Sequence, residues 1–109
     1  MITTLPPGLT AYRRTPEFDE NSLPSGLRRG HSTKAGVWAL IHVLEGRLRY
    51  RILEPLEETV LDAGGAPGVV VPQQLHEVEP LGAVRFYVEF HAARPVSGGP
   101  HERGGLPDA

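Results

Sequence analysis

The sequence predicts a small all-β protein, either a sandwich or a barrel, and three observations lead to this prediction. Thirteen glycines and eleven prolines are spread over 109 residues and leave only short segments between them. Those segments have the composition of strands, and turn signals separate them at the spacing typical of sandwiches and barrels. No stretch shows the period of an amphipathic helix.

The two central segments carry the clearest strand patterns. Residues 37–44 (VWALIHVL) are apolar on both faces, as in a strand that is covered on both sides. Residues 47–53 alternate, with Leu48, Tyr50 and Ile52 on one face and three arginines on the other. This alternation predicts a half-buried antiparallel strand whose second face is solvated.

Turn residues divide the rest of the globular part. Glu45-Gly46 is expected to form a tight turn between the two central strands. A last hairpin is expected around Leu81-Gly82. The remaining expected strands cover residues 58–61, 68–71, 76–79 and 84–90.

Length and composition favour one soluble domain in the cytoplasm. Residues 1–10 are predicted to be an arm, 11–93 the globular unit and 94–109 a flexible tail with little to bury. The net charge of −2 gives no case for a nucleic acid or an anionic membrane as partner. Cysteine is absent, which excludes disulfides and thiolate metal sites. The first residues do not resemble a signal peptide, and no apolar run is long enough to span a bilayer.

Three motifs, HSTKAGVW at 31–38, VLEGRLRY at 43–50 and VVVPQQLHEVEPLG at 69–82, together resemble the TehB/YeaR-like domain family. The resemblance covers about residues 12–91. It implies a single cupin-type barrel (a double-stranded β-helix or jelly roll) and a link to tellurite or other oxyanion stress resistance. Family members occur alone or fused in front of a methyltransferase. The chain has no Gly-rich nucleotide-binding loop after a strand, so methyl-transfer chemistry is not expected of it.

The resemblance to cupins also implies a candidate metal site, of which this sequence keeps only part. Metal-binding cupins present histidines and a glutamate that converge inside the barrel. His31 and His76 fit two of those positions, whereas Thr33 and Ala39 stand where a second histidine and the glutamate would be. Imidazole suits zinc, iron or nickel, and carboxylate suits manganese, so one of these divalent metals is the expected cofactor.

Two protein ligands make a weak site, so a third is needed. Glu89 is the candidate, although the register of the expected last hairpin places His76 inside beside Val88 and turns Glu89 outward. A one-residue bulge would reverse this orientation. The alternation along 37–44 likewise turns His42 outward or into a dimer contact.

Lys34 and Gln74 are the candidate ligand-binding residues beside the histidines. Lys34 is the only lysine and would offer positive charge to an anionic ligand at the mouth of the barrel. The alternative for Lys34 is an ordinary loop cation. For His31 and His76 the alternatives to a metal site are a metal-free ligand pocket and buried histidines satisfied by polar neighbours.

Three functions follow from these observations. The first is a binding module that holds a divalent metal or a small anionic ligand. The second is a metal-dependent enzyme, a dioxygenase or isomerase. The third is a structural homodimer, in which Trp38, Leu40 and Leu44 would pack on a second subunit and which is compatible with either of the others. The binding module is the preferred hypothesis.

Overall fold

The computed structural model describes residues 1–93 and confirms the all-β prediction. Within that range the only helical element is a single 3-10 turn, and no helix is long and apolar enough to cross a membrane. The elements are β1 (Thr10–Arg14), β2 (Phe18–Asp19), η1 (Ser25–Arg28), β3 (Trp38–Leu53), β4 (Leu56–Asp62), β5 (Gly68–Val70) and β6 (His76–Ala92). The expected tail, residues 94–109, lies outside the described residues.

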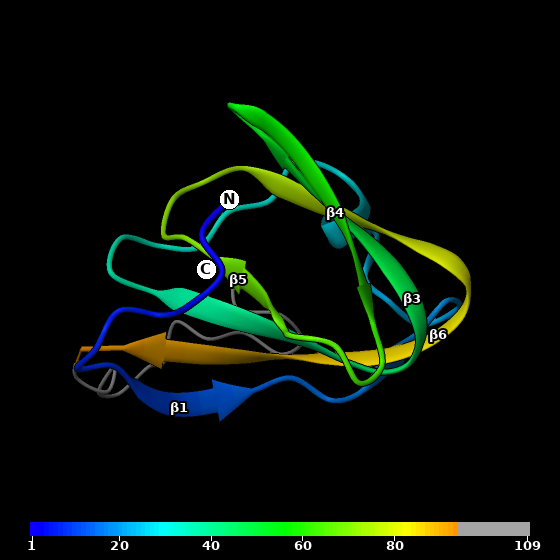
Figure 1. Cartoon of the computed structure of the whole chain (residues 1–109), viewed down its shortest axis with the longest axis horizontal. Helices are drawn as coiled ribbons and strands as arrows, with labels where there is room; N and C mark the ends of the chain where they lie inside the picture. The colour runs from blue at the N-terminus through cyan, green and yellow to red at the C-terminus, as the bar shows by residue number, and fades with distance from the viewer. Residues whose placement is uncertain (94–109) are drawn as a thin grey trace.

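Two long strands, β3 and β6, pair antiparallel along nearly their whole length and organise the sheet. Both strands bend sharply in Figure 1, and each therefore contributes to two layers. One layer contains β1, β5, the N-terminal half of β3 and the C-terminal half of β6. The other contains β4 with the remaining halves of the two long strands.

The bend occurs where the pairing of β3 with β6 shifts register, on either side of Gly46. Gly46 has φ +79°, a conformation that favours glycine, and a Cβ atom built there would lie 2.0 Å from the carbonyl oxygen of Ala83. The opposite strand has its own positive-φ glycine, Gly82. The glycines therefore permit a bulged bend in which two backbones approach closely.

The prediction of turns at Glu45-Gly46 and Leu81-Gly82 is wrong. The chain bends at these positions but does not reverse direction, and each pair of expected strands is one continuous strand. The predicted hairpin pairing of residues 76–79 with 84–90 is replaced by pairing of β6 with β3, for example Tyr50 with Val78 and His42 with Tyr87. A positive-φ glycine serves a bulge as well as a turn, and the surrounding sequence fits both.

The strands form one six-stranded sheet with the main order β1-β6-β3-β4, to which β2 and β5 add at the sides. In residues 1–93 the outer strands β1 and β4 do not pair with each other, so the expected closure into a cupin-type barrel is not found. The strand predicted at 58–61 is present as β4, which is longer at both ends. The strand predicted at 68–71 matches β5 to within one residue. The molecule is therefore an all-β fold of two facing layers connected by bent strands.

The core lies between the two layers. Leu48, Tyr50 and Ile52 are buried, which confirms the alternation predicted for this segment. The hydroxyl of Tyr50 donates a hydrogen bond of 2.8 Å to the carbonyl of Val69, and burial raises the pKa of this phenol. Phe86 and Phe90 fill the same interior from β6.

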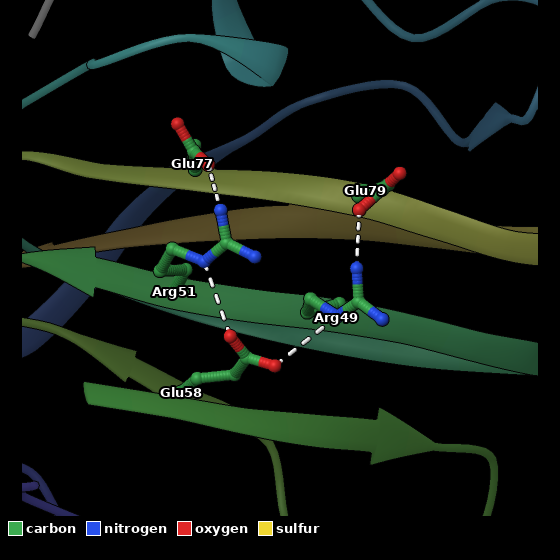
Figure 2. A network of polar contacts seen from close by, with 5 residues as sticks. All are labelled: Arg49, Arg51, Glu58, Glu77 and Glu79. Atoms are coloured by element: carbon green, nitrogen blue, oxygen red, sulfur yellow. Dashed lines mark hydrogen bonds and ion pairs between the residues drawn. The ribbon is translucent and has the colours of Figure 1, made fainter. Parts of the chain in front are cut away.

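The arginine face of β3 points away from the core and carries a network of ion pairs (Figure 2). Arg51 lies between Glu58 of β4 and Glu77 of β6, at 3.1 and 2.8 Å. Arg49 contacts the same Glu58 and also Glu79. Because these residues are direct or diagonal cross-strand neighbours, the network links three strands of one layer on its solvated side.

Candidate functional site

A pocket with an empty volume of about 370 Å³, part of it open to solvent, lies between the two layers. The space inside it is narrow and has room for a few heavy atoms at most. Apolar side chains from β3, β5 and β6 form most of the wall, and the loop between η1 and β3 supplies polar groups at one end. The lining residues are Leu27, His31, Thr33, Ala39, Ile41, Val70, His76, Val78, Phe86, Val88 and Phe90.

The structure brings His31 and His76 together at this pocket. Their backbones form an isolated antiparallel bridge, and their rings lie 5.4 Å apart between centroids, edge to face. The loop around them is fixed by further hydrogen bonds. The hydroxyl of Thr33 donates to the carbonyl of Val37 at 2.7 Å, and the amide of Gln73 donates to the carbonyl of Thr33 at 3.0 Å.

His76 is a deeply buried polar group of the pocket, with 4% of its surface exposed. Burial lowers the pKa of His76 to about 4 and the nearby His31 adds to this, whereas a hydrogen bond to the carbonyl of Gln74 opposes it. His76 is therefore a neutral imidazole at pH 7. Its Nδ1 atom lies 3.0 Å from that Gln74 carbonyl oxygen, and the ring of Tyr50 lies edge-on at 5.8 Å.

Glu89 lies elsewhere. It is on β6 opposite Leu40 and faces away from the interior, which is the orientation that the sequence predicts. The strand partner differs, because β6 pairs with β3 and not with itself in a hairpin. Its Oε1 atom lies 2.9 Å from Nε2 of His91 and 3.5 Å from Nε2 of His42. Partial burial raises the pKa of Glu89, but the contacts with these two imidazoles outweigh burial and lower it overall.

The two candidate ligand-binding residues differ in position. Lys34 is exposed and does not line the pocket. Gln74 contributes its backbone carbonyl to His76, and its side-chain Oε1 atom is buried without a hydrogen-bond partner. A ligand contact by either residue stays a prediction.

The expected divalent metal is not supported. In residues 1–93, no three side chains of the His, Asp and Glu types are grouped so that they could hold a metal ion. The physical reason is that the pocket wall around the two histidines is apolar, and Glu89, the proposed third ligand, is on the outer side of the sheet. The prediction of zinc, iron, nickel or manganese as cofactor is therefore wrong.

The apolar wall of the pocket was not predicted as a site. Ala39, Ile41 and Val88 fitted the inward positions of their strands, but burial alone does not distinguish a filled core from a pocket. The only signal that could have identified it was the placement of two histidines near one end of an otherwise apolar interior.

Comparison with known proteins places the chain in a family. A family model described as the TehB-like domain matches residues 13–88. The chain belongs to the TehB-like domain family. This confirms the family named from the three sequence motifs.

Relatives of this TehB-like domain include a protein of Haemophilus influenzae (strain Rd) named "Probable S-adenosyl-L-methionine-dependent methyltransferase TehB". It is 30% identical over 77 residues, which are 67% of this chain and 27% of the relative. The same name belongs to a relative from strain 10810 with the same identity and coverage. The chain thus spans about a quarter of the length of these relatives.

Two solved structures resemble the TehB-like domain. The crystal structure of TehB from Haemophilus influenzae superposes with a TM-score of 0.72 at 27% identity, over 79% of this chain and 32% of that one. A protein from Escherichia coli K12 gives a TM-score of 0.77 at 21% identity, over 85% of this chain and 99% of that one. The similarity to the Escherichia coli protein concerns the fold alone, and it extends over nearly the whole length of that protein.

These relatives correct the functional hypothesis. They are named as S-adenosylmethionine-dependent methyltransferases, not as metal-binding cupin modules or metal-dependent dioxygenases or isomerases. Together with the apolar surroundings of the two histidines, this overturns the metal-binding function and its enzymatic alternative. Lys34 does not line this pocket, and the expectation that it contacts an anionic ligand stays a prediction.

Proposed function

We propose that this TehB-like domain is a small-molecule-binding module that accompanies S-adenosylmethionine-dependent methyl transfer without performing it. The observation that carries the proposal is the narrow apolar pocket between the two layers, with His31 and His76 at one end. A concave apolar site with a few convergent polar groups is the usual form of a ligand site. The methyltransferase connection comes from the names of the relatives.

S-adenosylmethionine itself does not fit the residues present. It carries an adenosine, a sulfonium cation and an amino-acid group, and these require a long cleft with carboxylate or other polar partners. The pocket is narrow, and within residues 1–93 its lining contains no carboxylate. The module would therefore bind a different small molecule, and the cofactor of the relatives would belong to the part of their chains that this one does not match.

The pocket favours an uncharged ligand. Among residues 1–93 its lining contains no lysine or arginine, and the buried imidazole of His76 is neutral at pH 7. Moving an anion from water into such surroundings costs several kcal/mol unless a cation or several donors compensate, and the pocket supplies no fixed cation. A neutral molecule of a few heavy atoms avoids this cost.

Catalysis within the pocket has little support from its chemistry. A general base works best with a pKa near the operating pH, whereas the pKa of His76 is about 4. In the described part of the chain, the pocket lining also has no acidic residue that could orient or activate an imidazole. Binding and presentation of a ligand is therefore the role that the geometry supports best.

An NMR titration of ¹⁵N-labelled protein tests the proposal. Small neutral probes such as 2-propanol and acetone should shift amide signals of His31, His76 and Val88, whereas sodium tellurite should not. A Val88→Phe variant fills the pocket and should abolish the shifts, with Val88→Leu as a milder second variant. Tyr87→Phe, one residue away on the outer face of β6, should leave them unchanged. Shifts that are absent for every probe, or that survive in both Val88 variants, would contradict the proposal.

A further inference from the structure

The two ring nitrogens of His76 have different environments, and the fold decides which of them carries the proton. Nδ1 lies 3.0 Å from the backbone carbonyl oxygen of Gln74. A carbonyl oxygen only accepts hydrogen bonds, so Nδ1 must be the donor in this contact. In a neutral imidazole only one nitrogen carries a proton, and Nε2 is then a bare acceptor.

The position of the Gln74 carbonyl is fixed by the turn that precedes β6. Gln73 adopts a positive φ of 63°, and its amide donates to the carbonyl of Thr33. The amide of Gln74 donates to the carbonyl of Val71 at 3.3 Å. Because the turn is held at both of these points, the carbonyl keeps its direction, and the tautomer of His76 follows from the backbone.

The ring is also held in place on its other sides. The backbone of His76 is bridged to His31, and its ring meets the rings of His31 and Tyr50 edge-on. The hydroxyl of Tyr50 is already engaged, since it donates to the carbonyl of Val69. Tyr50 therefore contributes an aromatic wall to the ring of His76, and its proton is committed elsewhere.

We propose, resting on the small-molecule-binding function above, that the pocket selects an uncharged ligand with an O–H, S–H or N–H group that donates a hydrogen bond to Nε2 of His76. The apolar side chains Ile41, Val88 and Phe90 would contact the rest of the ligand. A molecule that only accepts hydrogen bonds gains no partner at Nε2, because two acceptors repel each other. The ligand class is therefore small neutral alcohols, thiols and related donors with an apolar body.

Small neutral hydrogen-bond donors are also chemically related to methyl transfer, the reaction for which the relatives are named. The acceptor in a methyl transfer is a nucleophile, and a neutral oxygen, sulfur or nitrogen nucleophile commonly carries a proton until it reacts. A pocket that accepts that proton in a hydrogen bond, and whose histidine is too weak a base to remove it, would hold such a molecule in its unreacted form. The proposal concerns this binding step alone.

Matched probe pairs test the inference. 2-Propanol and acetone share one heavy-atom skeleton and differ in whether the oxygen donates, and ethanethiol and dimethyl sulfide are isomers that differ in the same way. NMR titration should show the donor of each pair binding more tightly, by about three- to tenfold for the oxygen pair, the value of one net hydrogen bond, and by less for the weaker S–H donor. In a His76→Phe variant this difference should disappear, and in His91→Phe, a histidine of the outer face, it should persist.

The outcomes separate this inference from the function on which it rests. Equal binding of both members of each pair would overturn the donor requirement and leave the binding pocket in place. Failure of all four probes to bind would overturn both. If His76→Phe does not fold, a long-range ¹H–¹⁵N spectrum of the wild-type histidines still decides the matter. It should show His76 with its proton on Nδ1 at pH 7, and a proton on Nε2 would overturn the inference.

Discussion

The backbones of His31 and His76 exchange two hydrogen bonds, from N of His31 to O of His76 at 2.9 Å and from N of His76 to O of His31 at 2.8 Å. This bridge ties the loop before β3 to the first residue of β6. It closes one end of the space between the two layers. The same contact that completes the fold at this end thus places both imidazoles at the pocket.

Acid should destabilise the protein through His76. The pKa of His76 is lowered from 6.5 to about 4 in the folded state, so between these values the unfolded chain binds more protons than the folded chain. The contribution of His76 is complete above pH 6.5 and is lost as the pH falls toward 4. It amounts to about 3 kcal/mol of unfolding free energy.

Urea denaturation at pH 7.5 and pH 4.5 measures this effect. His76→Phe removes the titrating group but leaves the surface carboxylates in place, so the loss of stability between the two pH values should be smaller in this variant than in the wild type. Equal losses in both proteins would show that His76 does not titrate as its burial requires.

Core truncation should be costly where the two layers meet. Phe86 is fully buried on β6 and contacts Phe18, with ring centroids 5.7 Å apart. Phe86→Ala should lower the unfolding free energy by about 3–5 kcal/mol through lost burial and the cavity left behind. Leu56→Ala is the control, because Leu56 is 72% exposed, and it should change stability by less than about 0.5 kcal/mol. Chemical denaturation compares the two variants, and similar losses would refute the assigned core.

The bend at Gly46 should not tolerate a side chain. Gly46→Ala combines a positive φ with a Cβ atom 2.0 Å from the carbonyl oxygen of Ala83, so the two long strands would have to separate. Gly64→Ala is a matched control, since Gly64 has φ +86° but open space around its Cβ position. The control should lose about 1 kcal/mol from backbone strain alone, and Gly46→Ala should lose clearly more. Thermal melts of both variants make the comparison, and equal melting temperatures would contradict the close strand approach.

The ion-pair network of Figure 2 should contribute little on its own. Arg51 pairs with Glu58 and Glu77 on the solvated face, where water and salt screen the attraction. Arg51→Met should lower the stability only slightly, and the difference from wild type should shrink at high salt. Urea melts at low and high sodium chloride test this expectation. A large loss of stability that is insensitive to salt would mean that the network is more shielded from solvent than its exposure indicates.

Strand content and facing could be predicted from the sequence, whereas the connections between strands could not. The alternation of Leu48, Tyr50 and Ile52 identified the buried face because a half-covered strand leaves a period of two. Gly46 and Gly82 led to a wrong prediction, in which each ended a strand in a turn. A glycine with positive φ fits a hairpin and a bulge equally well, and only the long-range pairing of β3 with β6 distinguishes them.

The candidate site was predicted in part for a similar reason. The family resemblance drew attention to His31 and His76, which the structure places side by side. Their chemistry could not be read from the sequence. Two histidines hold a metal only if a third ligand lies close to both of them in the folded chain. Whether the candidate third ligand, Glu89, could do so depended on which face of its strand it occupies. The tautomer of His76 depends on the backbone carbonyl of Gln74, which no sequence pattern reveals.

The most direct test of the central claim is the anomalous sulfur signal in a crystal of this protein soaked with ethanethiol. The chain contains no cysteine and one methionine, so a bound thiol stands out against a low background. The binding-pocket account predicts a sulfur peak between the two layers, within hydrogen-bond distance of Nε2 of His76, and a weaker peak or none with dimethyl sulfide. A pocket that stays empty in the crystal soaked with ethanethiol would contradict it.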